Sequence, residues 1–364
     1  MNRLKTKFYS YVDAVAFICD LRRRAEKSNE RGSRFEHVAL TKEEKALIKS
    51  IWGKWGGKYD AFGFYKKFCG VFNPYYVPDD YYDYAEHVLN LRWSAYFLQH
   101  KCNLKYFIPK QNRAKVVLQK IDGHFVKEDN TEITKEEAKR ILLETPVFMA
   151  KVARGTGGGK GVQKINWDEI ADKEAYVEDL IKPIDMEFEE VLQQSEFMSQ
   201  FNPDSVNTMR LVTLNINGRC DVLSTFIRMG AKGSFVDNLS GGNGVLVGVK
   251  QDGTLNDFGI TKKYDKQYKS PVNVPFAGVK IPDFEKIKEI VMAFQRNIPY
   301  ANLIGWDIAL DEGNNVIVIE VNLDSAEIEA HQVFNGPVFG DRLDEVIEYI
   351  NMRKPYLKHQ MMLY

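Results

Sequence analysis

The chain has 364 residues, of which 44% are hydrophobic and 27% are charged. These proportions are ordinary for a folded globular chain, and the length suits two or three packed lobes. Fifty Lys and Arg residues balance fifty Asp and Glu residues, so a formal net charge of zero argues against bulk binding to nucleic acid or anionic membrane.

The N-terminal residues carry no recognisable targeting signal. No apolar signal-peptide core follows Met1–Phe8, and Val12–Cys19 is too short and too interrupted to span a bilayer. The four cysteines have no metal-binding spacing, so we expect free thiols in a reducing compartment. These features predict a cytoplasmic protein without a transmembrane segment.

Residues 10 to about 100 are predicted to be mainly helical. Thr41, followed by Glu43 and Glu44, is typical of a helix N-cap with acids in the first turn. Tyr81–His100 is predicted to form one amphipathic helix. The aromatic stripe at 52–68 favours packing between helices, although a platform for stacking nucleic-acid bases would use similar residues.

A glycine-rich loop follows a predicted strand, Thr145–Ala153, that contains Lys151. Because Val162–Ile165 continues as an extended run, this loop fits neither a P-loop nor a dinucleotide-binding turn, which both open a helix. The bare backbone N–H groups of such a flap can close over phosphate oxygens, with Lys151 as a point charge at its mouth. A mobile hairpin tip without a ligand is the alternative. The loop reads RGTGGGKG and consists of Arg154, Gly155, Thr156, Gly157, Gly158, Gly159, Lys160 and Gly161.

Two arginines are predicted to lie near each other on a β-hairpin. The segment NPDSVNTMRLV places Arg210 at the start of a strand, and Asn217-Gly218 is a preferred turn pair for a hairpin over residues 208–229. The planar fork of Arg210, joined by Arg228 from the other arm, suits a phosphate or carboxylate. A structural salt bridge is the alternative for both residues.

Three hard oxygen ligands occur in the stretch GWDIALDEGNNVIVIEVN, which is predicted to form a second hairpin. Glu320 and Asn322 are two residues apart and leave the same face of one strand, and the hairpin would bring Asp307 to that face. Two carboxylates and an amide oxygen are the ligands that Mg²⁺ takes when it also binds phosphate oxygens. A solvent-facing acidic hairpin is the alternative.

In this order, the segments resemble the ATP-grasp superfamily, and most closely its sugar-transfer-associated branch, which is linked to polysaccharide synthesis. The SVNTMR and GWDIA…IEVN motifs are the most specific. The matching segments lie in Tyr76–Tyr81, Leu89–Asn103, Val147–Val162, Phe188–Thr213, Val236–Gly242 and Ile304–Asn322.

The resemblance implies an α+β fold in which two α+β lobes hold ATP between them, after a helical N-terminal region. We expect the helical region at 1–100, an N-terminal lobe with the glycine-rich flap at 101–187, and a C-terminal lobe with the metal site at 188–364.

The resemblance also implies a role for each matching position. Lys101 and Lys151 would be the two nucleotide-binding lysines, the loop would close on the β- and γ-phosphates, and the connector would bind adenine and ribose through Glu189, Glu190, Val191 and Leu192. Arg210 would stabilise the transferring phosphoryl group, and Lys151 and Arg228 complete the predicted catalytic set. Asp307, Glu320 and Asn322 would hold one or two Mg²⁺ ions. The chain departs from the branch at His100, where Asp or Asn is usual, and at Ser195, where His is common.

The activity that the resemblance implies is an ATP- and Mg²⁺-dependent carboxylate–amine ligase that works through an acylphosphate. Its expected substrates are an amino acid or other amine and a carboxylate, such as a uronic acid of a surface polysaccharide or capsule, with glycan-synthesis enzymes as partners. The first alternative is an ATP-grasp kinase that phosphorylates a sugar hydroxyl. The second is a non-catalytic, ATP-binding partner of a glycan-synthesis complex.

Overall fold

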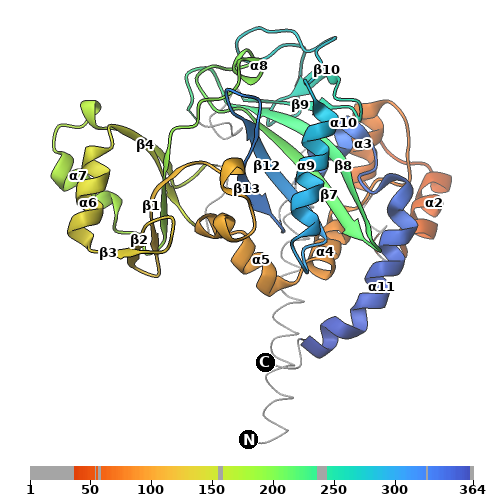
Figure 1. Cartoon of the computed structure of the whole chain (residues 1–364). Helices are drawn as coiled ribbons and strands as arrows, with labels where there is room; N and C mark the ends of the chain where they lie inside the picture. The colour runs from red at the N-terminus through yellow and green to blue at the C-terminus, as the bar shows by residue number, and fades with distance from the viewer. Residues whose placement is uncertain are drawn as a thin grey trace, which may run out of the picture.

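Two separate antiparallel sheets organise the molecule, as the computed structural model shows (Figure 1). The structure describes residues 37–53, 55, 59–154, 159–235, 244–324 and 327–360, with side chains throughout except at 92, 93 and 354–360. The smaller sheet and the larger sheet stand side by side and are joined by the segment that leaves the smaller sheet at Glu190.

Helices precede both sheets in the chain. They are α2 (Lys42–Trp52), α3 (Asp60–Cys69), α4 (Asp79–Leu89) and α5 (Arg92–Leu98), followed by the 3₁₀ helices η2 (Lys101–Tyr106) and η3 (Lys110–Asn112). The predicted cap of the first helix is confirmed, because Thr41 and Glu44 form a reciprocal capping box. The aromatic stripe is confirmed as core, since the side chains of Trp52, Phe62 and Tyr65 are buried.

The prediction of one helix over Tyr81–His100 is wrong. The chain forms two helices that are separated at Asn90, whose side chain is buried. Its amide donates to the backbone oxygens of Leu303 and Leu323, each at 2.7 Å, and accepts a bond from the N–H of Leu303. The helix therefore breaks where a side chain must satisfy backbone groups of the larger sheet.

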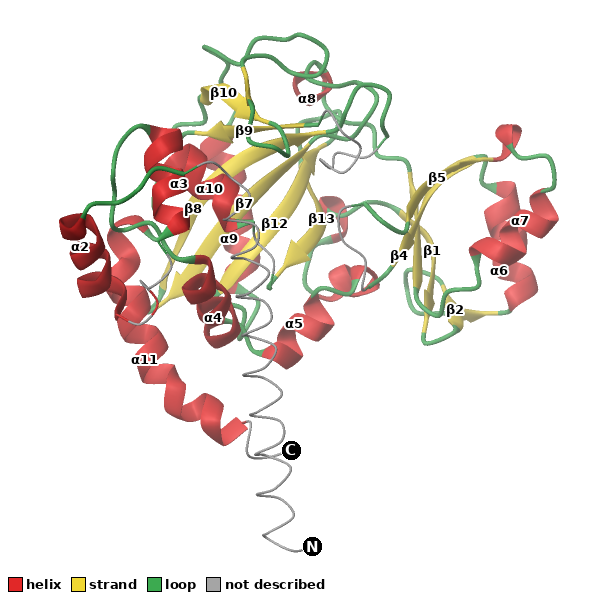
Figure 2. Ribbon diagram, turned by 180° about the vertical axis from the view of Figure 1, so that it is seen from behind, coloured by secondary structure: helices red, strands yellow, loops and turns green. Residues whose placement is uncertain are grey.

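The smaller sheet has six strands in the order β3-β2-β1-β6-β4-β5. Helices α6 and α7 cover one face and pack on its apolar residues, and the other face is turned toward the larger sheet (Figure 2). The elements are β1 (Val116–Ile121), β2 (His124–Val126), β3 (Glu132–Ile133), α6 (Lys135–Glu144), β4 (Val147–Val152), β5 (Val162–Asn166), η4 (Trp167–Glu169), α7 (Lys173–Leu180) and β6 (Met186–Glu190).

The larger sheet has seven strands in the order β11-β10-β9-β8-β7-β12-β13. Helix α9 packs on one face, and α4, α10 and α11 pack on the other. The elements are β7 (Thr208–Ile216), β8 (Arg219–Met229), β9 (Val245–Val249), β10 (Leu255–Ile260), β11 (Lys266–Gln267), β12 (Leu303–Leu310) and β13 (Val316–Asn322), with α8 (Glu196–Ser199), α9 (Phe284–Arg296), α10 (Ile328–Asn335), η6 (Gly340–Arg342) and α11 (Leu343–Gln360).

The predicted hairpin around Asn217-Gly218 is confirmed as the β7–β8 pair. Both turn residues have positive φ, 53° and 78°, which is the conformation that favours Asn and Gly at these positions. A register shift between Val212 and Thr213 then moves the pairing by one residue, so Arg210 lies opposite Phe226 and shares one face of the sheet with Arg228.

The α+β architecture agrees with the prediction, and the domain limits remain a prediction. Strand β6 continues past the expected limit at residue 187 to Glu190. It is paired with β1 and β4, so all of it belongs to the smaller sheet. Helices α2–α4 of the expected N-terminal region share a core with α10 and α11 of the larger sheet. In the part of the chain described, no helix combines the length and the apolar character that a bilayer crossing needs.

Candidate active site

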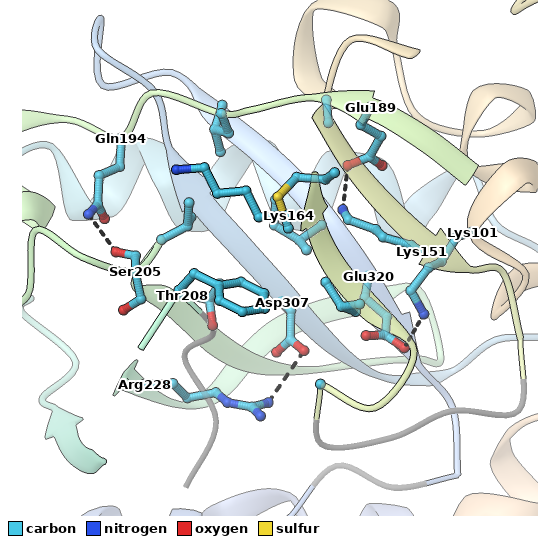
Figure 3. Close-up of a pocket in the computed structure, with 18 of the residues that line it drawn as sticks. Lys101, Lys151, Lys164, Glu189, Gln194, Ser205, Thr208, Arg228, Asp307 and Glu320 are labelled. Carbon is cyan, nitrogen blue, oxygen red and sulfur yellow. Dashed lines mark hydrogen bonds and ion pairs between the residues drawn. The ribbon is translucent and has the colours of Figure 1, made fainter. Parts of the chain in front are cut away.

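A cavity of about 750 Å³ lies between the two sheets and is lined by both of them (Figure 3). Gly155, Thr156, Gly157 and Gly158 lie outside the described residues. Of the described residues of the glycine-rich loop, Gly161 does not line this cavity. The predicted site residues that do line it are Lys101, Lys151, Arg154, Gly159, Lys160, Glu189, Glu190, Val191, Leu192, Arg210, Arg228, Asp307, Glu320 and Asn322.

The register of three neighbouring strands brings the predicted metal ligands together. Asp307 of β12 lies directly opposite Arg210 of β7 on one side and Glu320 of β13 on the other. Asn322 lies opposite Gly305, two residues before Asp307. Because directly paired residues project from the same face of a sheet, the three oxygen-bearing side chains share the face that borders the cavity.

Asp307 is held between two guanidinium groups. Arg210 binds it through two nitrogens, with 2.8 Å between Nη2 and Oδ2, and Arg228 of β8 approaches Oδ2 at 3.4 Å. The side chains of Arg210 and Asp307 are only 4% and 9% exposed. Burial alone would raise the pKa of Asp307, but Arg210 and Arg228 lower it below its ordinary value.

The two lysines are held by carboxylates in the same way. Lys101 lies on η2, which belongs to neither sheet, and its Nζ is 3.3 Å from Oε1 of Glu320 in the larger sheet. Lys151 of β4 forms a buried ion pair with Glu189 of β6. Burial alone would lower the pKa of Lys151, but Glu189 raises it, so the ammonium group stays charged.

The predicted strand–loop–strand arrangement of the glycine-rich flap is confirmed by the described residues. Strands β4 and β5 pair in antiparallel fashion from Val147 to Lys151. The N–H of Val152 donates to Gly161 at 2.8 Å, and Gly159 and Gly161 have φ of 75° and 73°. These left-handed conformations favour glycine, so the flap joins its second strand through a turn that other residues would strain.

Gln194 and Lys164 are two of the cavity residues that the sequence-predicted set does not contain. Gln194 follows the connector, and its side chain donates to the backbone oxygens of Asn202 and Ser205 and accepts two bonds from Asn207. Gln194 therefore fixes the loop that leads into β7. Lys164 lines the cavity from β5, opposite Met149, and its spacing of two residues from Val162, which also lines the cavity, places both on one face of the strand.

The donor set fits a magnesium ion. The candidate ligands are two carboxylates, Asp307 and Glu320, and one amide, Asn322. Among the described residues, no cluster of three or more His, Cys, Asp or Glu side chains could bind a metal ion. Oxygen donors of this kind suit Mg²⁺, which fills its remaining positions with water and phosphate oxygens. In the structure, the carboxylates of Asp307 and Glu320 instead bind Arg210, Arg228 and Lys101. If Mg²⁺ and a polyphosphate bound here, the metal ion would replace the cationic side chains as the partner of the carboxylates. The phosphate oxygens would replace the carboxylates as the partner of the cationic side chains.

A family model matches more than half of the chain. The family model described as sugar-transfer associated ATP-grasp matches residues 126–348. Comparison with curated proteins gives no significant match.

Several solved structures of ligases are similar to the chain. They include the ATP-grasp ligase PsnB in complex with a minimal precursor (12% identity, TM-score 0.41, 72% of this chain and 64% of that one). The D-alanine–D-alanine ligase of Coxiella burnetii has 11% identity and a TM-score of 0.39, covering 73% and 61%. The L-amino acid ligase of Bacillus licheniformis has 14% identity and a TM-score of 0.38, covering 68% and 44%. The chain thus spans less than two thirds of the length of each.

Proposed function

Since this chain belongs to the sugar-transfer associated ATP-grasp family, we propose that it is an ATP- and Mg²⁺-dependent ligase that joins a carboxylate to an amine. The observation that carries the proposal is the arrangement of cation–carboxylate pairs around one cavity, beside a glycine-rich flap. The pairs are Lys101–Glu320, Lys151–Glu189 and Arg210–Asp307.

The nucleotide would lie between the sheets. Lys101 and Lys151 would bind its phosphates, under the flap that begins after β4 and returns at Gly159. The connector, Glu190 to Leu192, offers backbone groups at the cavity wall for adenine, with Glu189 near the ribose. Phosphate oxygens would replace the carboxylates as the anionic partners of the two lysines.

Asp307, Glu320 and Asn322 would hold Mg²⁺, which would neutralise negative charge on the phosphate oxygens. Arg210 is then released from Asp307 and can stabilise the phosphoryl group in transfer. Arg228, which lines the same cavity and is 11% exposed, would orient the acceptor carboxylate.

The proposed chemistry has two steps. An oxygen of the acceptor carboxylate attacks the γ-phosphorus of ATP, the bond to the β-phosphate oxygen breaks, and ADP leaves with that electron pair. An amine then attacks the acyl carbon, inorganic phosphate leaves, and the amine loses a proton as the amide forms. A closed flap excludes water that would otherwise hydrolyse the acylphosphate.

The substrate class is part of the proposal. The family description, sugar-transfer associated, supports a carboxylate carried by a sugar or uronic acid of a surface polysaccharide, with glycan-synthesis enzymes as partners. The free thiols of Cys69, Cys102 and Cys220 are in keeping with the cytoplasmic location we propose.

A screen of ADP release over pairs of carboxylates and amines, followed by mass spectrometry of the product, tests this function. The ligase account predicts ADP and inorganic phosphate only when both substrates are present, together with a product lighter than their sum by one water. A phosphorylated product without an amine would instead identify a kinase. Nucleotide binding without turnover on any pair would support the non-catalytic alternative.

A further inference from the structure

A buried polar row lies beneath Lys151 on the face of the smaller sheet that borders the cavity. Gln119 of β1, Glu187 of β6 and Lys151 of β4 are directly opposite one another on three neighbouring strands. Glu187 is 3% exposed and Gln119 is fully buried. Glu189 lines the cavity, whereas Glu187 is buried behind the residues that line it.

Hydrogen bonds determine how Gln119 is oriented. Lys105 of η2 can only donate, and its ammonium binds Oε1 of Gln119 at 2.7 Å. The amide nitrogen of Gln119 must therefore face the other way, and it donates to Oε1 of Glu187 at 2.9 Å and to the backbone oxygen of Cys102 at 3.2 Å. Oε2 of Glu187 is buried and has no hydrogen-bond partner among the described residues.

Two carboxyl groups thus face one ammonium group. Glu189 forms the ion pair with Lys151, while Glu187 lies directly opposite Lys151 in the strand register. Burial, followed by the charge of Glu189, raises the pKa of Glu187 from its ordinary value to about 8, against the opposing effect of Lys151. At neutral pH Glu187 is therefore largely protonated. The positive charge of Lys151 is then balanced by the negative charge of Glu189.

The other groups that face Glu187 do not change this balance. Burial raises the pKa of the Cys102 thiol, which stays neutral, and burial lowers the pKa of Lys105, which still binds Gln119. From the larger sheet, Glu320 acts on Lys151 but is itself paired with Lys101.

We propose that Glu187 is a positioning residue that holds its proton more tightly when a nucleotide phosphate engages Lys151, so that above neutral pH nucleotide binding is coupled to proton uptake by this buried row. The inference rests on the proposed nucleotide site. In the free protein, the ammonium of Lys151 favours an ionised Glu187. Phosphate oxygens that take this ammonium remove part of that support, so Glu187 holds a proton more firmly in the complex.

The linkage has a definite sign. A group that binds protons more tightly in the complex makes affinity fall as pH rises, by up to about tenfold per pH unit for one linked proton. We expect the affinity for ATP to weaken between about pH 7 and pH 9 as the carboxyl of the free protein ionises.

Titration calorimetry of ATP into the full chain with excess Mg²⁺, at pH 8 in HEPES and in Tris, tests the inference. The two buffers differ in ionisation enthalpy, so their difference in heat gives the protons taken up. We expect the parent chain to take up a substantial part of one proton. The control Glu144→Gln, the same substitution at an exposed position on α6, should take up as much as the parent. Glu187→Gln, which mimics the protonated acid, should bind with the parent's affinity at pH 7, show only the uptake intrinsic to the nucleotide, and lose the dependence on pH.

Gln119→Leu provides a second variant. It removes the bond that favours ionised Glu187, so the fall in affinity should move to higher pH. Equal proton uptake by the parent and by Glu187→Gln would overturn the inference while leaving the nucleotide site intact. A parent chain that does not bind ATP would overturn the proposed function, and the inference with it.

Discussion

The two sheets supply the cavity with opposite arrangements of charge. In the larger sheet, one carboxylate, Asp307, lies between two guanidinium groups. In the smaller sheet, one ammonium, Lys151, faces two carboxyl groups, of which only Glu189 forms the ion pair. Guanidinium groups do not lose their protons in proteins, whereas one of two crowded carboxyls does titrate near neutral pH. The larger sheet therefore offers fixed charge for phosphoryl transfer, and the smaller sheet offers charge that responds to pH and ligand.

The largest expected effect comes from the fixed charge of the larger sheet. Arg210→Met should lower turnover by about 10³-fold or more, because it removes a cation from the phosphoryl group in transfer. Nucleotide affinity should change much less, since Lys101 and Lys151 remain. Steady-state kinetics beside nucleotide titration would separate the two effects, and an equal loss in both would place Arg210 in ground-state binding instead.

Asp307→Ala tests the buried triad of Arg210, Asp307 and Arg228 through its contribution to the stability of the fold. The variant leaves Arg210 buried without its carboxylate, so the free energy of unfolding should fall by about 3–5 kcal/mol. Urea denaturation monitored by tryptophan fluorescence gives this value. Glu144→Ala removes an exposed partner of Arg140 and should cost no more than about 1 kcal/mol. Similar losses in both variants would show that the buried triad adds no special stability.

In the smaller sheet, Lys151→Met should weaken ATP binding by about 10- to 100-fold, the worth of a charged hydrogen bond to phosphate. The matched control is Lys182→Met, which removes an exposed lysine from the same lobe. Unchanged affinity in Lys151→Met would mean that the nucleotide does not engage this sheet.

The smallest expected effect concerns stability and pH. The pKa of Glu187 is raised in the folded chain, so its contribution is full below the ordinary pKa of about 4.5 and is lost as pH rises toward about 8. Glu187→Gln has no such loss. The melting temperature of the variant, relative to that of the parent, should therefore increase as pH rises from 5 to 8. A constant difference across this range would show that Glu187 titrates normally.

The sequence predicted the larger-sheet part of the site well, because its signals are local. Asn217-Gly218 marks the β7–β8 hairpin, and the spacing of Glu320 and Asn322 fixes their common face. The structure confirms that Asp307 reaches that face, but a register shift between Asp307 and Ile308, which the sequence did not indicate, is also needed to bring it there.

The parts that the sequence did not predict depend on contacts between distant segments. Glu187 is one of several acids in a short strand, and only the pairing of β6 with β1 and β4 shows that it is buried opposite Lys151. Asn90 breaks a helix for the sake of backbone groups more than 200 residues away. Helical periodicity in one segment does not contain that information.

A crystal structure with a non-hydrolysable ATP analogue and Mg²⁺ tests the central claim most directly. The account predicts the triphosphate between the two sheets, with oxygens of Asp307, Glu320 and Asn322 at about 2.0–2.1 Å from the metal and Lys151 moved to a phosphate. A nucleotide bound elsewhere, with Asp307 still held by Arg210 and Arg228, would contradict it.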